Sequence, residues 1–328
     1  MGTVRIGGIA AAPGETKFGR LGKLELPDGT EISVPLIVAN GQHEGPKLLL
    51  TAAVHGTEIT GSEVIRRLTR ELLDLRQLRG TIVALPIVNP LAFHQSMMNT
   101  PQDLFNLNRT FPGVERSLTS FRLAHLVTNE ALAKCDYLID FHANPSPAMC
   151  FAIVKSVSER VDKPSEDMAR AFGITTIWMK KEHEHHRTGT INETAGELGK
   201  PSITVELIYW RRIEEKGVQV GIRGTLNVMK RLEMIDGAIE KQPGYESLNQ
   251  EGLTRIELTA NRGGFVHTLK VPGEPMAKGD KIALIRNPYG DVVEEIVTPV
   301  SGFVLAYPLL GNQAVSTGES VAFVATKG

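Results

Sequence analysis

The pattern of apolar and polar residues changes twice along the chain. Over the first 40 residues, apolar and polar positions alternate around Asp28-Gly29, which is typical of a β-hairpin. From residue 48 onward, short unbroken apolar runs predict buried strands at 48–54, 81–88, 137–141, 150–154, 174–178 and 202–208. Stretches with helical periodicity separate several of these runs, most clearly at 61–78 and 117–135, and another follows at 220–235. This alternation predicts a mixed, mainly parallel α/β sheet with helices on both faces.

The second change comes near residue 243. Residues 253–328 form short apolar runs punctuated by Gly, Pro and Asn-Pro turns, with almost no helical periodicity. We therefore predict an α/β domain over residues 1–243, with a β-rich part at 1–40, and a small all-β domain over residues 244–328. The stretch 271–307 resembles the flattened β-barrel of biotinyl and lipoyl carrier domains. Its expected hairpin tip, 287–290, lacks the lysine that a carrier needs, so a role in shaping a cleft or in oligomer contacts is favoured.

Composition excludes several classes of protein. The 328 residues are 41% apolar and 22% charged, which is typical of a soluble globular protein. The formal net charge of −1 gives no electrostatic reason to expect nucleic acid or an anionic membrane as a partner. No apolar run approaches the roughly 20 residues of a membrane span, and the first 17 residues lack a signal-peptide core. Cys135 and Cys150 are expected to be buried free thiols, which favours a reducing, cytoplasmic location.

Candidate ligands follow two of the predicted strands. In open α/β sheets, ligands bind at the carboxyl ends of the strands, where His55 and Glu58 follow one apolar run and His142 ends another. Two histidines and one carboxylate with an open coordination position are typical of catalytic zinc. Asp140 shares a strand face with His142, so we expect it to accept the outer N–H of a ligand imidazole. Glu206, near the end of the run at 202–208, suits a general base beside a metal-activated water.

Each of these residues also has an ordinary structural interpretation. A single histidine at a strand end is more often structural, and a glutamate at a helix start usually complements the helix dipole. The combination carries more weight than its members, because the architecture brings successive strand ends together.

Five short motifs occur in a characteristic order: "HGTE" at 55–58, "NP" at 89–90, "NLNRTFPG" at 106–113, "DFH" at 140–142 and "VEL" at 205–207. Together they resemble the succinylglutamate desuccinylase/aspartoacylase family of the zinc carboxypeptidase superfamily. The resemblance covers roughly residues 45–210, and the small β-domain also has counterparts in that family. It implies that zinc is held by His55, Glu58 and His142. It also implies that Glu206 activates the water and returns the proton to the leaving amine, while Asn108 and Arg109 grip a substrate carboxylate.

One position departs from the family pattern. Many relatives carry an arginine nine residues after the Asn of "NP", where it is thought to polarise the scissile carbonyl, but this chain has Met98. Another group must replace that donor, or the activity is weak. The candidates are His94, Asn99 and Arg187. A second metal site at His183, His185 and His186 is an alternative to a polar loop that borders the cleft, and the loop is favoured.

These observations predict a zinc-dependent amidohydrolase of the deacylase type. Its partner is expected to be a small-molecule N-acyl amino acid or a similar carboxylate-bearing amide, and a homo-oligomer is possible. Two alternatives stay open: a metallocarboxypeptidase that acts on short peptides, and a zinc-binding family member with weak or lost catalysis.

Overall fold

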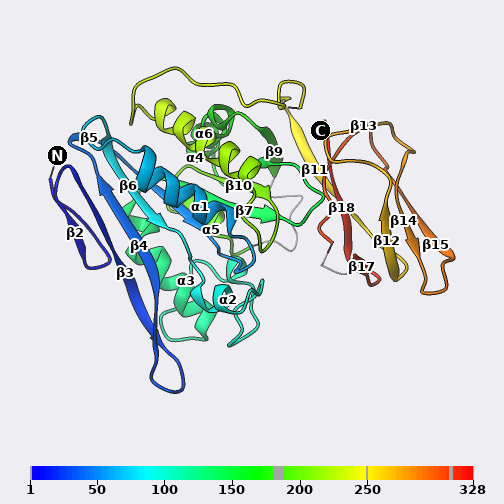
Figure 1. Cartoon of the computed structure of the whole chain (residues 1–328), viewed down its shortest axis with the longest axis horizontal. Helices are drawn as coiled ribbons and strands as arrows, with labels where there is room; N and C mark the ends of the chain where they lie inside the picture. The colour runs from blue at the N-terminus through cyan, green and yellow to red at the C-terminus, as the bar shows by residue number, and fades with distance from the viewer. Residues whose placement is uncertain (1, 180–187, 249, 310–312, 328) are drawn as a thin grey trace.

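An eight-stranded sheet forms the centre of the larger part of the molecule, which we call the α/β unit (Figure 1). The computed structural model describes residues 2–179, 188–248, 250–309 and 313–327. In spatial order the strands are β3 (Glu15–Glu25), β4 (Glu31–Asn40), β6 (Arg79–Leu85), β5 (His43–Ala52), β7 (Tyr137–Asn144), β10 (Ser202–Ile208), β8 (Phe151–Lys155) and β9 (Thr175–Met179).

Parallel strands occupy the middle of this sheet. β5 pairs in parallel with both β6 and β7, and β7 pairs in parallel with β10. The β8–β9 pair is also parallel, whereas β3–β4, β4–β6 and β8–β10 are antiparallel. The expected mixed, mainly parallel sheet is therefore confirmed. The expected hairpin also forms, because β3 and β4 are joined at Asp28, whose side chain accepts a hydrogen bond from the Thr30 backbone N–H at 3.0 Å.

Helices cover both faces of the sheet. One face packs against α1 (Thr60–Arg67), α4 (Glu159–Phe172) and α6 (Glu215–Arg231). The other packs against α3 (Thr119–Glu130), α5 (Ile191–Glu197) and the hairpin of β1 (Val4–Ile6) and β2 (Ile9–Ala11). The remaining helical elements are short: η1 (Leu68–Leu72), α2 (Pro90–His94), η2 (Leu107–Arg109) and η3 (Leu132–Lys134).

The helix expected at 61–78 is shorter than its periodicity suggested. After α1, the π-helical turn η1 ends the helix, and Leu73 adopts an extended conformation. Asp74 then accepts a hydrogen bond from the Arg76 backbone N–H at 3.0 Å, which forms a turn instead of a further helical turn. The buried cysteines agree with expectation: Cys135 and Cys150 are free thiols, and burial raises the pKa of each to about 12. Among the described helices, none is both long and apolar enough to cross a membrane.

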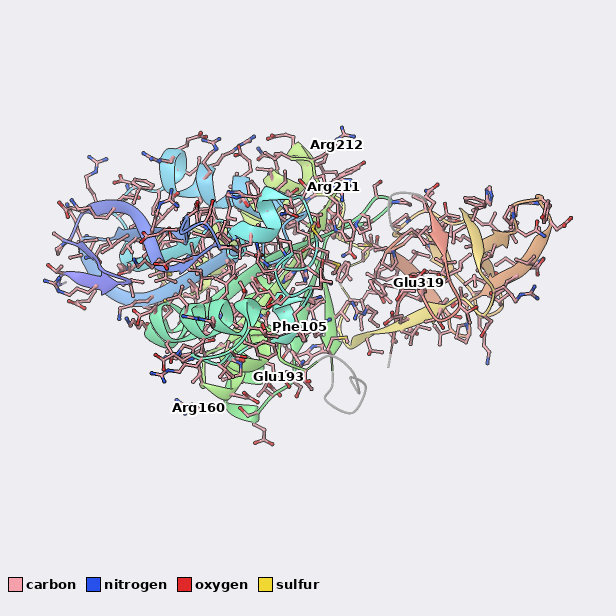
Figure 2. All side chains as sticks on the ribbon, turned by 90° about the horizontal axis from the view of Figure 1, so that it is seen from below. Phe105, Arg160, Glu193, Arg211, Arg212 and Glu319 are labelled. Atoms are coloured by element: carbon pink, nitrogen blue, oxygen red, sulfur yellow. The ribbon has the colours of Figure 1, made fainter. Side chains whose placement is uncertain are left out.

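The C-terminal β unit consists of two antiparallel four-stranded sheets, ordered β11-β18-β16-β13 and β15-β14-β12-β17. Its strands are β11 (Leu253–Thr259), β12 (Gly264–Thr268), β13 (Pro275–Met276), β14 (Lys281–Arg286), β15 (Val292–Val297), β16 (Gly302–Ala306), β17 (Ala314–Val315) and β18 (Ser320–Lys327). The unit packs against the α/β unit through Leu305 and Phe323, which share an apolar cluster with Phe151 and Ile177. Figure 2 shows the two units side by side. The boundary at residue 243 stays a prediction.

Candidate metal centre

The first two candidate ligands lie in the tight turn that follows β5. Ala53 has a φ of 50°, which turns the chain out of the strand, and the Glu58 backbone N–H donates to the His55 carbonyl at 3.1 Å. Gly56 has no room for a side chain, because a Cβ there would lie 2.1 Å from the carbonyl carbon of Ala92 in α2. The "HGTE" turn therefore rests directly on the "NP" segment, and this contact sets its position.

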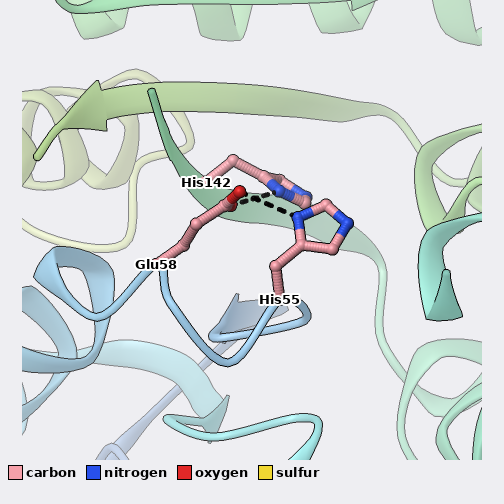
Figure 3. Close-up of side chains that lie close together, drawn as sticks. All are labelled: His55, Glu58 and His142. Atoms are coloured by element: carbon pink, nitrogen blue, oxygen red, sulfur yellow. Dashed lines mark hydrogen bonds and ion pairs between the residues drawn. The ribbon is translucent and has the colours of Figure 1, made fainter. Parts of the chain in front are cut away.

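His55, Glu58 and His142 converge on one point, as Figure 3 shows. The Nδ1 atom of His55 lies 2.9 Å from Oε1 of Glu58, and the Nδ1 atom of His142 lies 2.8 Å from Oε2 of the same carboxylate. The possible ligand atoms of the three residues all lie within 4.8 Å of one another, and the three side chains are buried. Two strands that are neighbours in space thus bring together residues that are 84 positions apart in sequence.

The outer nitrogen of each imidazole is also held. His142 Nε2 donates to Oδ2 of Asp140 at 2.8 Å, and the fully buried Asp140 in turn accepts from the Thr51 hydroxyl at 2.6 Å. His55 Nε2 lies 3.0 Å from the side-chain oxygen of Asn106 and donates to it. Both Nδ1 atoms are thereby directed at the Glu58 carboxylate. Asp140 lies where the sequence predicts it, whereas Asn106, the first residue of "NLNR", was not recognised as a candidate.

The electrostatics of the cluster fit a bound cation. Burial alone would raise the pKa of Glu58, but the charges of His55 and His142 outweigh it and hold the pKa well below its usual value. Burial likewise opposes protonation of His142, yet Asp140 and Glu58 raise its pKa well above the usual value. The cluster thus stabilises positive charge at its centre. Two imidazoles and a carboxylate form the donor set of many catalytic zinc sites, and metal binding would displace the proton.

Glu206 lies beside this cluster because β10 is the next strand after β7, with Glu206 in register with His142. Its side chain is partly buried, and burial raises its pKa to about 7. The Asn144 side-chain amide donates a hydrogen bond to Glu206 Oε2 at 2.8 Å. A carboxyl group with a pKa near neutrality can accept a proton and release it again near neutral pH. Sequence reasoning did not single out Asn144.

A cavity of about 310 Å³ lies over the cluster, and Asn108 and Arg109 are among the residues that line it. The Asn108 side-chain oxygen accepts from the Ile191 backbone N–H at 3.0 Å, which fixes it at the start of α5. Arg109 Nη1 donates to the Asn108 carbonyl at 2.6 Å. Both residues predicted to bind substrate therefore face the same space as the three candidate ligands, and their roles stay a prediction.

Met98 also lines this cavity, but two of the residues considered as replacements for its missing donor do not. His94 and Asn99 are not among the described residues of the lining, and the Asn99 side chain donates to the Leu104 carbonyl at 3.1 Å. Arg187 and the three histidines at 183, 185 and 186 lie outside the described residues. Three lining residues come instead from the C-terminal part of the chain: Arg255, Pro308 and Phe323.

The fold and the cluster together define a class of protein. A metallo-carboxypeptidase from Burkholderia cenocepacia has a similar fold, with a TM-score of 0.52, 17% identity, and coverage of 66% of this chain and 65% of that one. The α/β unit thus has the zinc-carboxypeptidase-like fold. The catalytic-domain model of the succinylglutamate desuccinylase/aspartoacylase family matches residues 44–232, more than half of the chain. The chain belongs to this family, which confirms the resemblance of its motifs.

Similarity to individual relatives extends over nearly the whole chain. The N-alpha-acetyl-L-2,4-diaminobutyric acid deacetylase of Halomonas elongata is 22% identical over 321 residues, which are 93% of this chain and 90% of the relative. The solved succinylglutamate desuccinylase/aspartoacylase from Rhodobacter sphaeroides has a TM-score of 0.83 at 24% identity, with 95% of each chain covered. The shared fold therefore includes the C-terminal β unit.

Proposed function

We propose that the protein is a zinc-dependent deacylase that hydrolyses the amide bond of an N-acyl amino acid or a similar small carboxylate-bearing amide. The observation that carries this proposal is the convergence of His55, Glu58 and His142 beneath a cavity that also contains Glu206. Membership of the family and the deacetylase from Halomonas elongata support amide hydrolysis as the reaction.

The zinc would be held by His55 and His142 through their Nδ1 atoms and by Glu58 through its carboxylate. Zinc in such a site supplies a Lewis acid that lowers the pKa of a water molecule and polarises the amide carbonyl. Asp140 and Asn106 keep the two imidazoles in the tautomer whose Nδ1 is available as a ligand.

Glu206 is the proposed general base. It takes a proton from the attacking water, and as a carboxylic acid it gives that proton to the leaving nitrogen. Burial raises its pKa above the usual value, to about 7 without a metal, which favours the protonated form that returns the proton. Asn144 holds one carboxylate oxygen at 2.8 Å, which leaves the other oxygen for the water.

The cavity favours a small substrate. Its volume of about 310 Å³ lies at the lower end of the range of roughly 300–1,000 Å³ that is usual for small-molecule sites. Arg109 presents a planar guanidinium that can bind a substrate carboxylate through two hydrogen bonds, with the Asn108 amide beside it. A long peptide would have to pass the wall that Arg255 and Phe323 contribute, which disfavours the carboxypeptidase alternative.

The test is a metal analysis of the purified protein coupled to hydrolysis assays. We expect about one zinc per chain and release of free amino acid from members of a panel of N-acyl amino acids, with little cleavage of matched dipeptides. Faster cleavage of the dipeptides would favour the carboxypeptidase alternative. A protein that holds zinc but hydrolyses neither panel would favour a family member without catalysis.

A further inference from the structure

Asn144 makes a direct hydrogen bond to the proposed base. It is the last residue of β7, only 6% exposed, and its Nδ2 donates to Glu206 Oε2 at 2.8 Å. In the parallel β7–β10 pair, Glu206 is in register with His142 and Ile208 is in register with Asn144. Because alternate residues of a strand share a face, Asn144 approaches Glu206 from the same face that presents His142. One strand thus carries both a candidate metal ligand and the residue that holds the base.

The chemistry of the contact suits a base. A carboxamide donor holds a carboxylate oxygen without adding a positive charge, whereas an arginine or lysine at that distance would lower the pKa of Glu206 and its basicity. Among the described residues, the charged groups that act on Glu206 are His55, Glu58 and His142 and, from β11, Arg255. Asn144 therefore fixes the position of the carboxylate and leaves its charge to these groups.

The segment after β10 is hydrogen-bonded to the end of β7, next to Asn144. Residues 209–212, which we call the clasp, follow directly after the strand of Glu206. Trp210 Nε1 donates to the Ala143 carbonyl at 2.7 Å, and the Tyr209 backbone N–H donates to the Asn144 carbonyl at 3.0 Å. The clasp therefore ties the end of β10 to the end of β7 on both sides of the Asn144 backbone.

The clasp also reaches the turn of the first two ligands. The Arg211 backbone N–H donates to the Thr57 carbonyl at 2.7 Å, and its guanidinium donates to the Ser96 carbonyl at 3.1 Å. Tyr209 and Arg211 have φ values of 71° and 57°, a left-handed conformation that residues with side chains rarely adopt. A backbone outlier at such a place persists when the surrounding contacts over-determine it, and it points to a functional constraint. Figure 2 shows Arg211 beside Arg212 on the side of the α/β unit that faces the C-terminal β unit.

We propose that Asn144 is the positioning residue of the general base, and that the clasp keeps it in place so that Glu206 stays at a fixed position relative to His55, Glu58 and His142. This proposal rests on the proposed function for its kinetic consequences. The hydrogen bond between Asn144 and Glu206 is testable without any activity.

Kinetics of Asn144→Asp and Asn144→Ala test the positioning role. Asp has the same shape but cannot donate to Glu206 when ionised, and Ala removes the contact. For both variants we expect kcat to fall about 10- to 100-fold, the range found when outer partners of a catalytic site are lost, with KM changed less than about threefold and zinc content unchanged. In Asn144→Asp the added negative charge also moves the acid limb of the pH–rate profile to higher pH.

The matched control is Asn227→Ala. Asn227 is also a buried asparagine, and it lies in α6, outside the described lining of the cavity. Its side chain donates to the Glu240 carbonyl at 2.7 Å. This variant is expected to lower the melting temperature and leave kcat unchanged. If the Asn144 variants keep kcat within twofold, or lose activity only in proportion to zinc or folded protein, Asn144 is not a positioning residue.

A second measurement does not depend on turnover. In metal-free protein, the side-chain amide resonances of Asn144 should shift with pH as Glu206 titrates, and this shift should disappear in Glu206→Gln. Amide resonances that do not follow Glu206 overturn the proposal even if no substrate is known. An inactive wild type whose Asn144 resonances do follow Glu206 contradicts only the proposed function.

Discussion

The carboxyl edge of the central strands and the C-terminal β unit both face the cavity, but they are built in different ways. At the strand edge, hydrogen bonds of 2.8–3.0 Å connect His55, Glu58, His142 and Glu206 to one another or to a neighbour. In the C-terminal β unit, Arg255 contacts the cavity through a side chain whose guanidinium carbon lies 4.4 Å from the centre of the Phe323 ring. The strand edge therefore sets the positions of individual atoms, whereas the β unit sets the shape and the charge of the cavity wall.

The difference follows from what each task requires. Bond cleavage depends on donors and acceptors being placed to a fraction of an ångström, and adjacent parallel strands provide this because their register is set by the backbone. A cavity wall needs only to exclude water and fit the substrate, so a sheet held by apolar contacts is sufficient. We therefore expect changes at the edge to abolish turnover and changes in the β unit to alter the preference for substrates.

The largest effect is expected for His142→Ala. The change removes one proposed Nδ1 ligand and leaves the Glu58 carboxylate with a single imidazole, so a zinc ion held as proposed would be lost together with its Lewis acid chemistry. Such chemistry contributes several kcal/mol, so hydrolysis should fall at least about 10³-fold. Metal analysis and hydrolysis assays check both losses. Retention of stoichiometric zinc at wild-type affinity would contradict the assignment of this ligand.

The next largest effect is expected for Glu206→Gln, which distinguishes loss of the base from loss of the metal. Glu206→Gln keeps the shape and the Asn144 neighbour but cannot accept a proton, so kcat should fall about 10²- to 10³-fold while zinc content stays at the wild-type level. Steady-state kinetics and metal analysis on the same preparation measure both quantities. Wild-type turnover in this variant would mean that a different group activates the water.

The parts of the fold that the sequence predicted are those where burial leaves a regular pattern. The central strands read as unbroken apolar runs because helices cover both of their faces. α4 was not singled out, because its buried positions include Ser165 and Ala169 and it contains Pro164, all of which weaken the apolar stripe. The excess length predicted for the first helix has a similar cause, since Leu73 and Leu75 continue the periodicity after the backbone has become extended.

The candidate site was only partly visible in the sequence. Strand ends can be read from apolar runs, so His55, Glu58, His142 and Glu206 could be chosen. Their proximity depends on the order β5-β7-β10, which no local pattern encodes. Asn106 stood in a recognised motif but had no assigned role, and Asn144 and Arg255 left no recognisable signal, because an amide or a guanidinium gains its role only from the partner that folding brings to it.

The pH dependence of kcat/KM tests Glu206 as the base without any substitution, and its expected effect is smaller. Glu206 acts as a base only when it is deprotonated, and burial raises its pKa to about 7 without metal. A bound cation favours the deprotonated form, so with zinc held as proposed the acid limb of the pH–rate profile lies at or below pH 7. Below that limb kcat/KM should fall tenfold per pH unit, and above it activity should be retained. Zinc content measured over the same pH range separates this limb from loss of the metal. A flat profile down to pH 5 would exclude a base with a raised pKa.

The smallest effects are expected in the C-terminal β unit, and they should differ between its two ends. Arg255→Met keeps the contact with Phe323 but removes the charge from the cavity wall. Because a hydrogen bond to a charged group contributes at least about 1.5 kcal/mol, KM for an anionic substrate should rise at least about tenfold with kcat changed little. Tyr289→Ser is the control, since Tyr289 is 91% exposed in the turn between β14 and β15, the strand pair that lies farthest from the α/β unit in Figure 1. Its kinetic constants and stability should match the wild type.

If Arg255→Met instead lowers kcat as strongly as Glu206→Gln, the β unit takes part in the chemistry. The proposed difference in role between the strand edge and the β unit is then wrong.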